Sequence, residues 1–155
     1  GFSVAAAPRV GTALGAEDAE AAAHTAKVVP LVGGLSSLVL ISILAVFRHE
    51  WALLFVPDDS DVARAVARLI LHVLVLYVWA DATQGAFTGT LRGCGRQRSA
   101  APVVVVAYFV VGLPLAAVLA FDFGAGLGVE GLCWGTCVAT IVHMLALGVM
   151  VVRTR

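Results

Sequence analysis

The sequence predicts an all-α fold, a polytopic bundle of membrane-spanning helices, because of its composition and its long apolar segments. Of the 155 residues, 61% are hydrophobic and only 13% are charged, and the mean hydropathy is +0.99. Soluble domains hold about 45–50% apolar and about 25% charged residues. A spanning helix needs about 20 apolar residues. Four segments reach that length: residues 28–47, 69–91, 99–121 and 131–152.

Three of these segments carry no Lys, Arg, Asp or Glu. Helices of a soluble core would show a polar outer stripe, whereas these are apolar on all sides, which predicts a membrane protein. Residues 1–14 are also apolar but too short to span, and they lack the basic region of a signal peptide. We therefore expect four complete spans and the end of a fifth helix, in a piece of a larger protein.

Basic residues fall mainly on one side of the expected bundle. With residues 1–14 counted as a span, one side holds seven of them: Arg9, Lys27, Arg92, Arg96, Arg98, Arg153 and Arg155. The opposite side holds three, which lie among several acids: Arg48, Arg64 and Arg68. Cytoplasmic loops carry an excess of Lys and Arg, which predicts a cytoplasmic C-terminus. The formal net charge of zero gives no reason to expect a nucleic-acid partner.

Asp81 lies at the middle of segment 69–91, which is otherwise uncharged. An ionised acid at membrane depth costs about 2.5–3.5 kcal/mol on insertion scales, and such residues usually face a protein interior or a water-filled cavity and serve ions or substrates. The Leu, Ile, Val and Phe residues of the segment each return about 0.3–0.6 kcal/mol, so the helix still inserts. We predict that Asp81 is a functional carboxylate shielded from lipid. The alternative is an acid that a neighbouring helix merely satisfies.

Polar residues recur beside Asp81 at helical spacing. Tyr77, Asp81, Gln84 and Thr88 share one face, which predicts the wall of a cavity. Small residues also recur every four positions close to this stripe, a pattern that lets another helix backbone approach closely. They are Gly85, Gly89 and Gly93.

Other polar residues give weaker signals. His72 lies about half a turn from Asp81 around the helix axis, which favours a packing or interface role. His143 lies deep in the last segment and is a candidate for a hydrogen bond across the bundle. The cysteines predict neither a disulfide nor a metal site at their spacing. They are Cys94, Cys133 and Cys137.

Proline and acidic residues mark bends and helix ends. Pro114 with Gly112 interrupts segment 99–121, either as a hinge or as a static bend for packing. Acidic and hydroxyl residues can cap two helices at their N-termini. For the second helix these are Glu17, Asp18 and Glu20, and for the third they are Asp58, Asp59, Ser60 and Asp61.

Three runs carry a resemblance to a known family. The run GFSVAAAPRVGTALGA (1–16) with residues 17–22 resembles the signature near the end of the eighth helix in the multidrug and toxic compound extrusion (MATE) family. The turn LRGCGRQ (91–97), and Tyr108 to Leu115 with its Val-Gly-Leu-Pro, are similar to that family's tenth-to-eleventh helix turn and eleventh helix. The residues of these runs are most similar to the eukaryotic, animal-type branch of the family. The sequence departs from the family pattern at Pro8, Thr12 and Glu17.

The resemblance implies part of the C-terminal lobe of a twelve-helix exporter built as two six-helix lobes. Residues 1–14 would end helix 8, and helices 9 to 12 would be residues 23–47, 62–91, 99–121 and 131–152. Such proteins export small organic cations in exchange for protons, with sodium as the alternative coupling ion, and need no resident cofactor. Asp81 falls where relatives place an acid in helix 10. The expected partners are small organic cations, the lipid bilayer and the missing N-terminal lobe of the same protein. The expected location is the plasma membrane.

Other functions stay open at this point. The first lobe and the family's principal acid in helix 7 are not in these residues, so one alternative is a truncated membrane protein that does not transport. Another is a lipid or lipid-linked sugar flippase, which would be expected to line its cavity with Arg or Lys. An enzyme fits poorly because no nucleophile–base pair stands at helical spacing.

Overall fold

The structure is a computed structural model that describes residues 2–55, 60–121 and 124–153. The described residues form helices joined by short turns, with no strand among them. Two helices contain a turn of π-helix, labelled η1 and η2. In chain order the elements are α1 (Phe2–Gly15), α2 (Ala19–Val46), α3 (Arg48–Phe55), α4 (Ser60–Leu69), η1 (Ile70–Leu74), α5 (Val75–Gly93), α6 (Gln97–Val105), η2 (Val106–Gly112), α7 (Leu113–Ala120) and α8 (Val129–Arg153).

Four helices in the described part of the chain are long and apolar enough to cross a membrane. They are Ala19–Val46, Asp61–Gly93, Gln97–Ala120 and Val129–Arg153. The second runs through α4, η1 and α5, and the third through α6, η2 and α7. This agrees with the four spans and the all-α membrane bundle that the sequence predicts.

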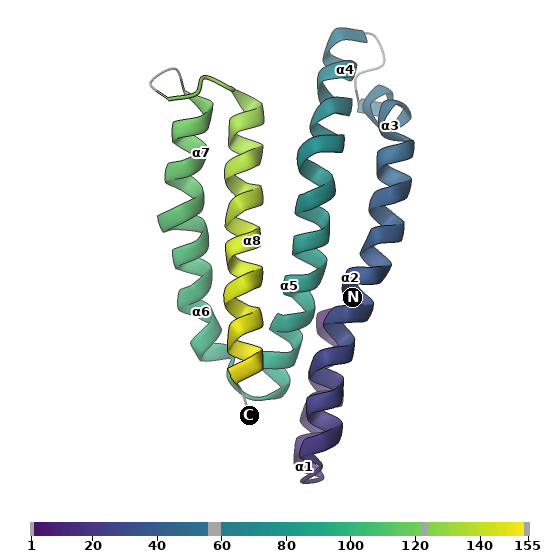
Figure 1. Ribbon diagram of the computed structural model, residues 1–155, viewed down its shortest axis with the longest axis vertical. Helices are drawn as coiled ribbons and strands as arrows, with labels where there is room; N and C mark the ends of the chain where they lie inside the picture. Colours follow the sequence, from purple (N-terminus) through teal and green to yellow (C-terminus); the bar gives the residue numbers. More distant parts are fainter. Residues whose placement is uncertain (1, 56–59, 122–123, 154–155) are drawn as a thin grey trace.

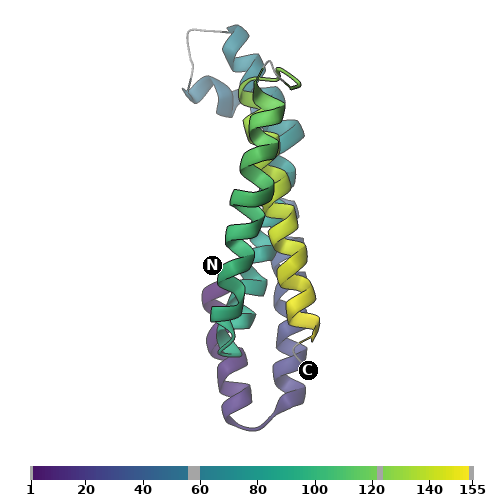
Figure 2. The same cartoon turned by 90° about the vertical axis from the view of Figure 1, so that its left-hand side faces the viewer.

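The spans form an elongated bundle in which α5 occupies the centre (Figure 1). α5 packs against α1, α2 and α8, while α7 packs against α8. The α1–α2 turn, the α5–α6 turn and the end of α8 lie at one end of the bundle, and the α3–α4 pair and the α7–α8 connection lie at the other (Figures 1 and 2). The two groups of basic segments distinguished in the sequence therefore lie at opposite ends.

A glycine in a left-handed backbone conformation closes the α5–α6 turn. Gly95 has a φ of 70°, a left-handed conformation that glycine adopts without a Cβ clash. The amide of Arg96 donates to the Leu91 carbonyl at 2.9 Å, and the amide of Gly95 donates to the Arg92 carbonyl at 3.0 Å. These two bonds form a Schellman motif, which satisfies the last carbonyls of α5. The chain therefore reverses tightly and α6 begins at once.

The α1–α2 turn repeats this geometry with an unfavourable residue. Glu17 holds a φ of 59°, the only positive φ at a non-glycine residue in the described chain. The amide of Asp18 donates to the Ala13 carbonyl at 2.9 Å, as in the other turn. Asp18 then caps α2, because its carboxylate accepts from the Ala21 amide at 2.9 Å. The predicted cap of the second helix is confirmed for Asp18, whereas Glu17 instead closes α1.

We expect Glu17→Gly to stabilise the protein. A left-handed conformation costs an L-residue about 1–2 kcal/mol, and glycine removes that cost while losing part of the gain to its freer unfolded chain. The net rise in the free energy of unfolding should be about 0.5–1 kcal/mol, measured on the full-length protein by detergent-induced unfolding. Glu17→Ala is the matched control, since it removes the charge but keeps the Cβ. Equal stabilisation by both variants would contradict the backbone explanation.

Glycines set how closely α1 approaches α5. A Cβ on Gly89 would lie 2.5 Å from the Ser3 carbonyl oxygen, and one on Gly93 would lie 2.7 Å from the Ala7 carbonyl oxygen. The predicted close approach of another helix is confirmed at these two positions, and α1 is that helix. At Gly85 no described atom lies within 4 Å of an added Cβ, so the third member of the series faces open space.

A second small-residue contact, which the sequence analysis did not single out, joins α7 to α8. A Cβ on Gly131 would lie 2.5 Å from the Leu119 carbonyl oxygen, and one on Gly135 would lie 2.6 Å from the Ala116 amide nitrogen. A Cβ on Gly112 would lie 2.6 Å from the Ala139 side chain. The last two spans therefore pack almost backbone to backbone.

The π segments interrupt the two spans that flank α8. In η2 the amide of Leu113 donates to the Tyr108 carbonyl, five residues back. Pro114 follows directly; it has no N–H to donate, and its ring crowds the preceding turn, which favours the wider register. In η1 the amide of Val75 donates to the Ile70 carbonyl in the same way, without a proline. The helix is thus interrupted before Pro114 by a π-helical segment, and whether this acts as a hinge or a static bend stays a prediction.

The helices α3 and α4 form the end of the bundle opposite the α5–α6 turn. Ala52 on α3 packs with Ala63 and Ala67 on α4 in a small apolar cluster. The sequence analysis placed no helix at α3. Asp61 lies in the first turn of α4, where it pairs with Arg64. The other predicted caps of this helix, Asp58, Asp59 and the Ser60 side chain, lie outside the described residues.

Candidate functional site

The polar stripe of α5 is held together by hydrogen bonds along one side of the helix. The Gln84 side-chain amide donates to an Asp81 carboxylate oxygen at 3.0 Å. The Thr88 hydroxyl donates to the Gln84 carbonyl of its own helix at 2.9 Å. Tyr77 lies one turn before Asp81 on the same side of the helix. The structure therefore places the four predicted residues in one continuous row.

Asp81 has no basic partner in the described ranges of the chain. Its side chain is exposed in the described chain, and no Lys, Arg or His among the described residues forms a salt bridge with it. An ionised carboxylate facing lipid at this depth would cost about 2.5–3.5 kcal/mol. Helical rotation places the stripe between the side of α5 that packs on α1 and the side that packs on α8. Further protein or water on this face would keep the carboxylate out of contact with lipid.

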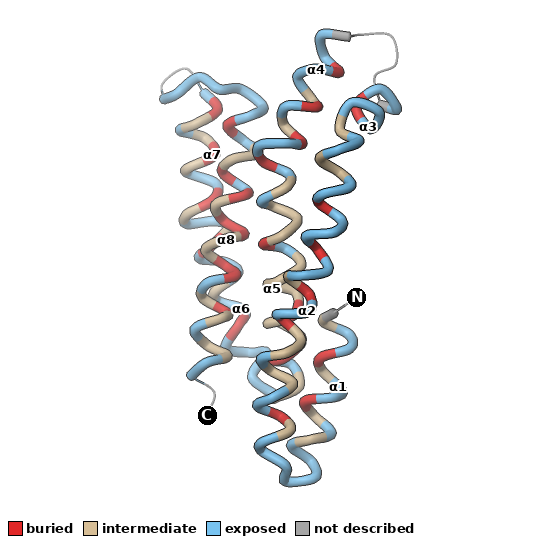
Figure 3. Tube along the Cα trace, turned by 45° about the vertical axis from the view of Figure 1, so that its right-hand side comes forward, coloured by how far each residue is buried: buried red, intermediate tan, exposed pale blue. Residues whose placement is uncertain are grey.

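A second set of polar groups comes from α8 and η2. Buried positions recur along α8, which lies between α5 and α7 (Figure 3). Among them are Thr140 and His143, which are 0% and 6% exposed. Tyr108 of η2 contacts both: its hydroxyl lies 3.1 Å from the Thr140 oxygen, and its ring meets the His143 ring edge-on with centroids 5.7 Å apart.

The direction of the Tyr108–Thr140 hydrogen bond follows from a neighbouring bond. Thr140 donates its hydroxyl proton to the Thr136 carbonyl at 3.0 Å. A hydroxyl has one proton, so Thr140 must accept from Tyr108. The Tyr108 proton is thus committed, and the tyrosine presents its ring to His143. Cys137, one turn before, is buried and directs its thiol at the Val73 carbonyl of η1 at 3.9 Å.

The two sets meet along α8, which packs against both α5 and η2. Val73 contacts Cys137 and Phe87 lies against Gly148, so Asp81 and His143, which lie between these two contacts, are at a similar depth in the bundle. We name the assembled group the polar cluster: Tyr77, Asp81, Gln84, Tyr108, Thr140 and His143. The sequence pointed to its α5 members and singled out His143 without a partner. Tyr108 and Thr140 were missed as site residues, and their only sequence signal is polarity within an otherwise apolar span.

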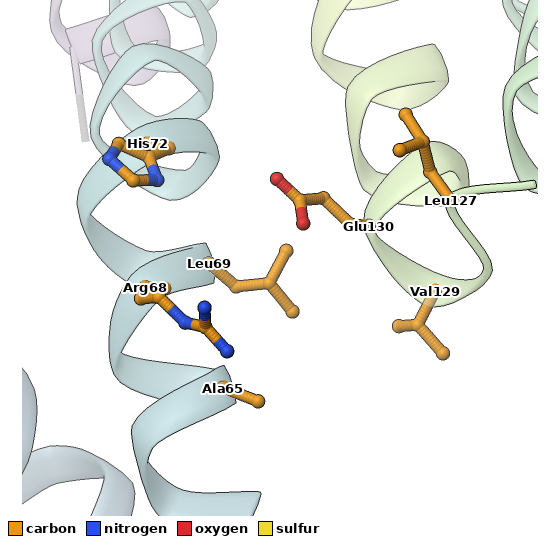
Figure 4. A pocket seen from close by; sticks show the side chains of 7 residues that line it. All are labelled: Ala65, Arg68, Leu69, His72, Leu127, Val129 and Glu130. Carbon is orange, nitrogen blue, oxygen red and sulfur yellow. The ribbon is translucent and has the colours of Figure 1, made fainter. Parts of the chain in front are cut away.

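A groove of about 390 Å³, called the outer groove for its place at the α3–α4 end of the bundle, lies between α4–η1 and the start of α8. Arg68 and His72 line one side and Glu130 lines the other, with the carboxylate directed across the groove (Figure 4). A second groove of about 430 Å³ lies between α5 and α8 and is almost wholly apolar, with Trp79, Phe87 and Met144 among its lining residues. Neither groove includes Asp81.

The chemistry of the polar cluster suits binding and proton exchange. It combines one carboxylate, one imidazole, two phenols, one amide and one hydroxyl, all set among apolar spans. Within the described residues no group of three or more His, Cys, Asp and Glu is placed to hold a metal ion. A polytopic helix bundle with an ionisable group at membrane depth has the features of a membrane transporter.

Comparisons with known proteins agree with this class. The MatE family model matches residues 1–118. Protein DETOXIFICATION 16 of Arabidopsis thaliana is 32% identical over 99% of this chain and 31% of its own length. Human multidrug and toxin extrusion protein 1 is 36% identical over 91% of this chain and 24% of its own length. The crystal structure of the eukaryotic MATE transporter AtDTX14 superposes with a TM-score of 0.90 at 31% identity, covering 99% of this chain and 34% of that one.

The chain belongs to the MatE family, which confirms the assignment made from its motifs. It spans about a third or less of the length of these relatives. The relatives are named as transporters and extrusion proteins, not as enzymes. The chain is a multi-pass membrane protein, and its helices correspond to part of a transporter.

Proposed function

We propose that the full-length protein containing this chain is an antiporter that exports organic cations in exchange for protons. Asp81 is the residue at which the cation and the proton compete. The observation that carries this proposal is a carboxylate at membrane depth without a basic partner among the described residues. Either a proton or an organic cation neutralises its charge, and both cannot do so together.

The neighbours of Asp81 have separate roles in this proposal. Gln84 donates to the carboxylate and fixes its orientation. Tyr77 offers an aromatic face, which attracts an organic cation by about 0.5–2 kcal/mol. Thr88, whose hydroxyl is already bonded to Gln84, lines the path as a small polar group.

Competition becomes transport when the site opens to each side in turn. An outer proton that reaches Asp81 displaces the cation, and an inner cation displaces the proton after the bundle reorients. This needs movement of one lobe against another, which the chain supplies only together with the rest of the protein. The exposed face of Asp81 between α1 and α8 is the surface that we assign to the central cavity.

The proposed location is the plasma membrane, with the C-terminus in the cytoplasm. The α1–α2 turn, the α5–α6 turn and the end of α8 share one end of the bundle and carry most of the basic residues. Cytoplasmic loops are enriched in Lys and Arg. Cys94 lies in the α5–α6 turn and reports on which side that turn faces.

We expect Cys94 to react with a membrane-impermeant maleimide only from the cytoplasmic face. Burial raises the pKa of the Cys94 thiol, while Arg96 acts in the opposite direction. Below a raised pKa the reactive thiolate fraction grows about tenfold per pH unit, so labelling at about pH 8 should be about ten times faster than at about pH 7. Cys94→Ser reports the background from the other cysteines. Equal labelling from the outer face would contradict the orientation.

The function is tested with full-length protein in vesicles loaded with tetraphenylphosphonium, a cation whose own charge does not change with pH. An inward proton gradient should drive its release, and the vesicle lumen should become more acidic as protons enter in exchange for the cation. A sodium gradient alone should have no effect. Release driven by sodium would show that sodium, and not the proton, is the coupling ion. No release under either gradient would refute the proposal.

A further inference from the structure

His143 is buried with an unsatisfied nitrogen. Its side chain is 6% exposed, and its Nδ1 is the one buried side-chain nitrogen or oxygen without a hydrogen-bond partner in the described chain. A buried polar atom left unpaired costs free energy, so it calls for an explanation. One explanation is that Nδ1 binds its partner reversibly, and a proton is such a partner.

Among the residues that the structure describes, Asp81 is the one acid on the elements facing His143. α5 contributes Tyr77 and Asp81, and η2 contributes Tyr108, whose proton is committed to Thr140. The other elements packed on α8 contribute no acid: α7 has no titratable residue, α6 has only Arg98 near the basic turn, and η1 has only His72 in the outer groove. Along α8 itself, Cys133 and Cys137 precede His143, with Glu130 in the outer groove and Arg153 at the opposite helix end.

Asp81 and His143 therefore carry opposite potential charges on neighbouring helices. The contacts of Val73 with Cys137 and of Phe87 with Gly148 place the two residues at a similar depth on helices that pack side by side, so an ionised Asp81 and a protonated His143 would attract each other without a hydrogen bond. Such attraction is strong in a low-dielectric interior even beyond contact distance. When two ionisable groups interact in this way, their protonation steps belong to the pair.

We propose that His143, when protonated, is an internal cation that neutralises Asp81 and competes with the transported cation for it. This inference rests on the proposed function and adds a second proton-holding residue on α8. The cation-free pair holds one proton, either on the carboxylate or on the imidazole. The incoming cation takes the place of that proton, which leaves to the aqueous side then open.

The consequence is that His143 moves cation–proton competition toward neutral pH. With two groups able to hold the proton, the pair binds it more readily than a lone carboxylate would. Removing the imidazole should leave Asp81 to titrate alone, so that cation binding persists to more acidic solutions. Binding in alkaline solution, where His143 is neutral, should barely change.

The test measures tetraphenylphosphonium binding to purified full-length protein from about pH 5 to about pH 9, a range that spans histidine titration. In His143→Gln the midpoint pH for loss of binding should fall by about one unit, which is about tenfold in proton concentration. Its alkaline affinity should stay within about twofold of the wild type, since the competitor is then uncharged. His72→Gln is the matched control, because it makes the same change in the outer groove, and its midpoint should not move.

An unmoved midpoint in His143→Gln would overturn the inference. So would loss of binding at every pH in both His143→Gln and His143→Asn with the protein still folded, because His143 would then build the cation site. Asp81→Asn separates this inference from the proposed function. If that variant binds the cation as the wild type does, the proposed function fails; if it loses binding while the His143→Gln midpoint stays in place, only the inference fails.

Discussion

Asp81→Asn in the full-length protein is expected to reduce proton-driven transport of tetraphenylphosphonium to the background of empty vesicles. The amide has nearly the same shape as the carboxylate and can still accept from Gln84, so the local structure is kept. It carries no charge, so it neither attracts the cation nor takes up the exchanged proton. The measurement is uptake or release under a pH gradient, together with the amount of protein in the membrane.

The matched control for this variant is Asp18→Asn. It makes the same chemical change in the same chain, and asparagine caps a helix about as well as aspartate. Asp18 lies in the α1–α2 turn, outside the polar cluster. Transport should stay at the wild-type level in this control. Unchanged transport by Asp81→Asn, with the control also unchanged, would remove the basis of the proposed exchange.

Of the glycine positions discussed above, Gly135 is the one where a change to alanine should destabilise the protein most. The added Cβ would lie 2.6 Å from the Ala116 amide nitrogen and closer still to other Ala116 atoms. These include backbone, which cannot turn aside as a flexible side chain could. Overpacking of this kind costs about 1–3 kcal/mol, and the drop should appear in detergent-induced unfolding and in a lower yield of folded protein.

Gly85→Ala provides the matched control for the packing effect. Gly85 also lies inside a spanning helix, but no described atom comes within 4 Å of an added Cβ. The change in helix propensity is therefore similar while the contact differs. Stability should stay equal or rise slightly in this control. A loss as large as that of Gly135→Ala would show that helix glycines matter here for a reason other than close packing.

The sequence by itself was sufficient for the class of fold and the position of the spans. A bilayer requires about 20 apolar residues per helix, and this requirement acts on each segment separately, so it can be read locally. The same holds for Asp81, because a charge in an apolar span is conspicuous without knowledge of its neighbours. The Asp18 cap and the tight turn at Gly95 are also local, since each depends on residues within a few positions.

Only the tertiary structure decided which helix faces meet. Tyr108 and Thr140 are 32 positions apart, and their hydrogen bond depends on how η2 and α8 are rotated against each other. The Gly131 and Gly135 contacts with α7 depend on the same rotation. Spans that are apolar on all sides have little sequence pattern from which the rotation of one helix against another could be predicted. The placement of His143 near Asp81 therefore follows from the packing of α8 against α5, to which small residues contribute through close backbone contact.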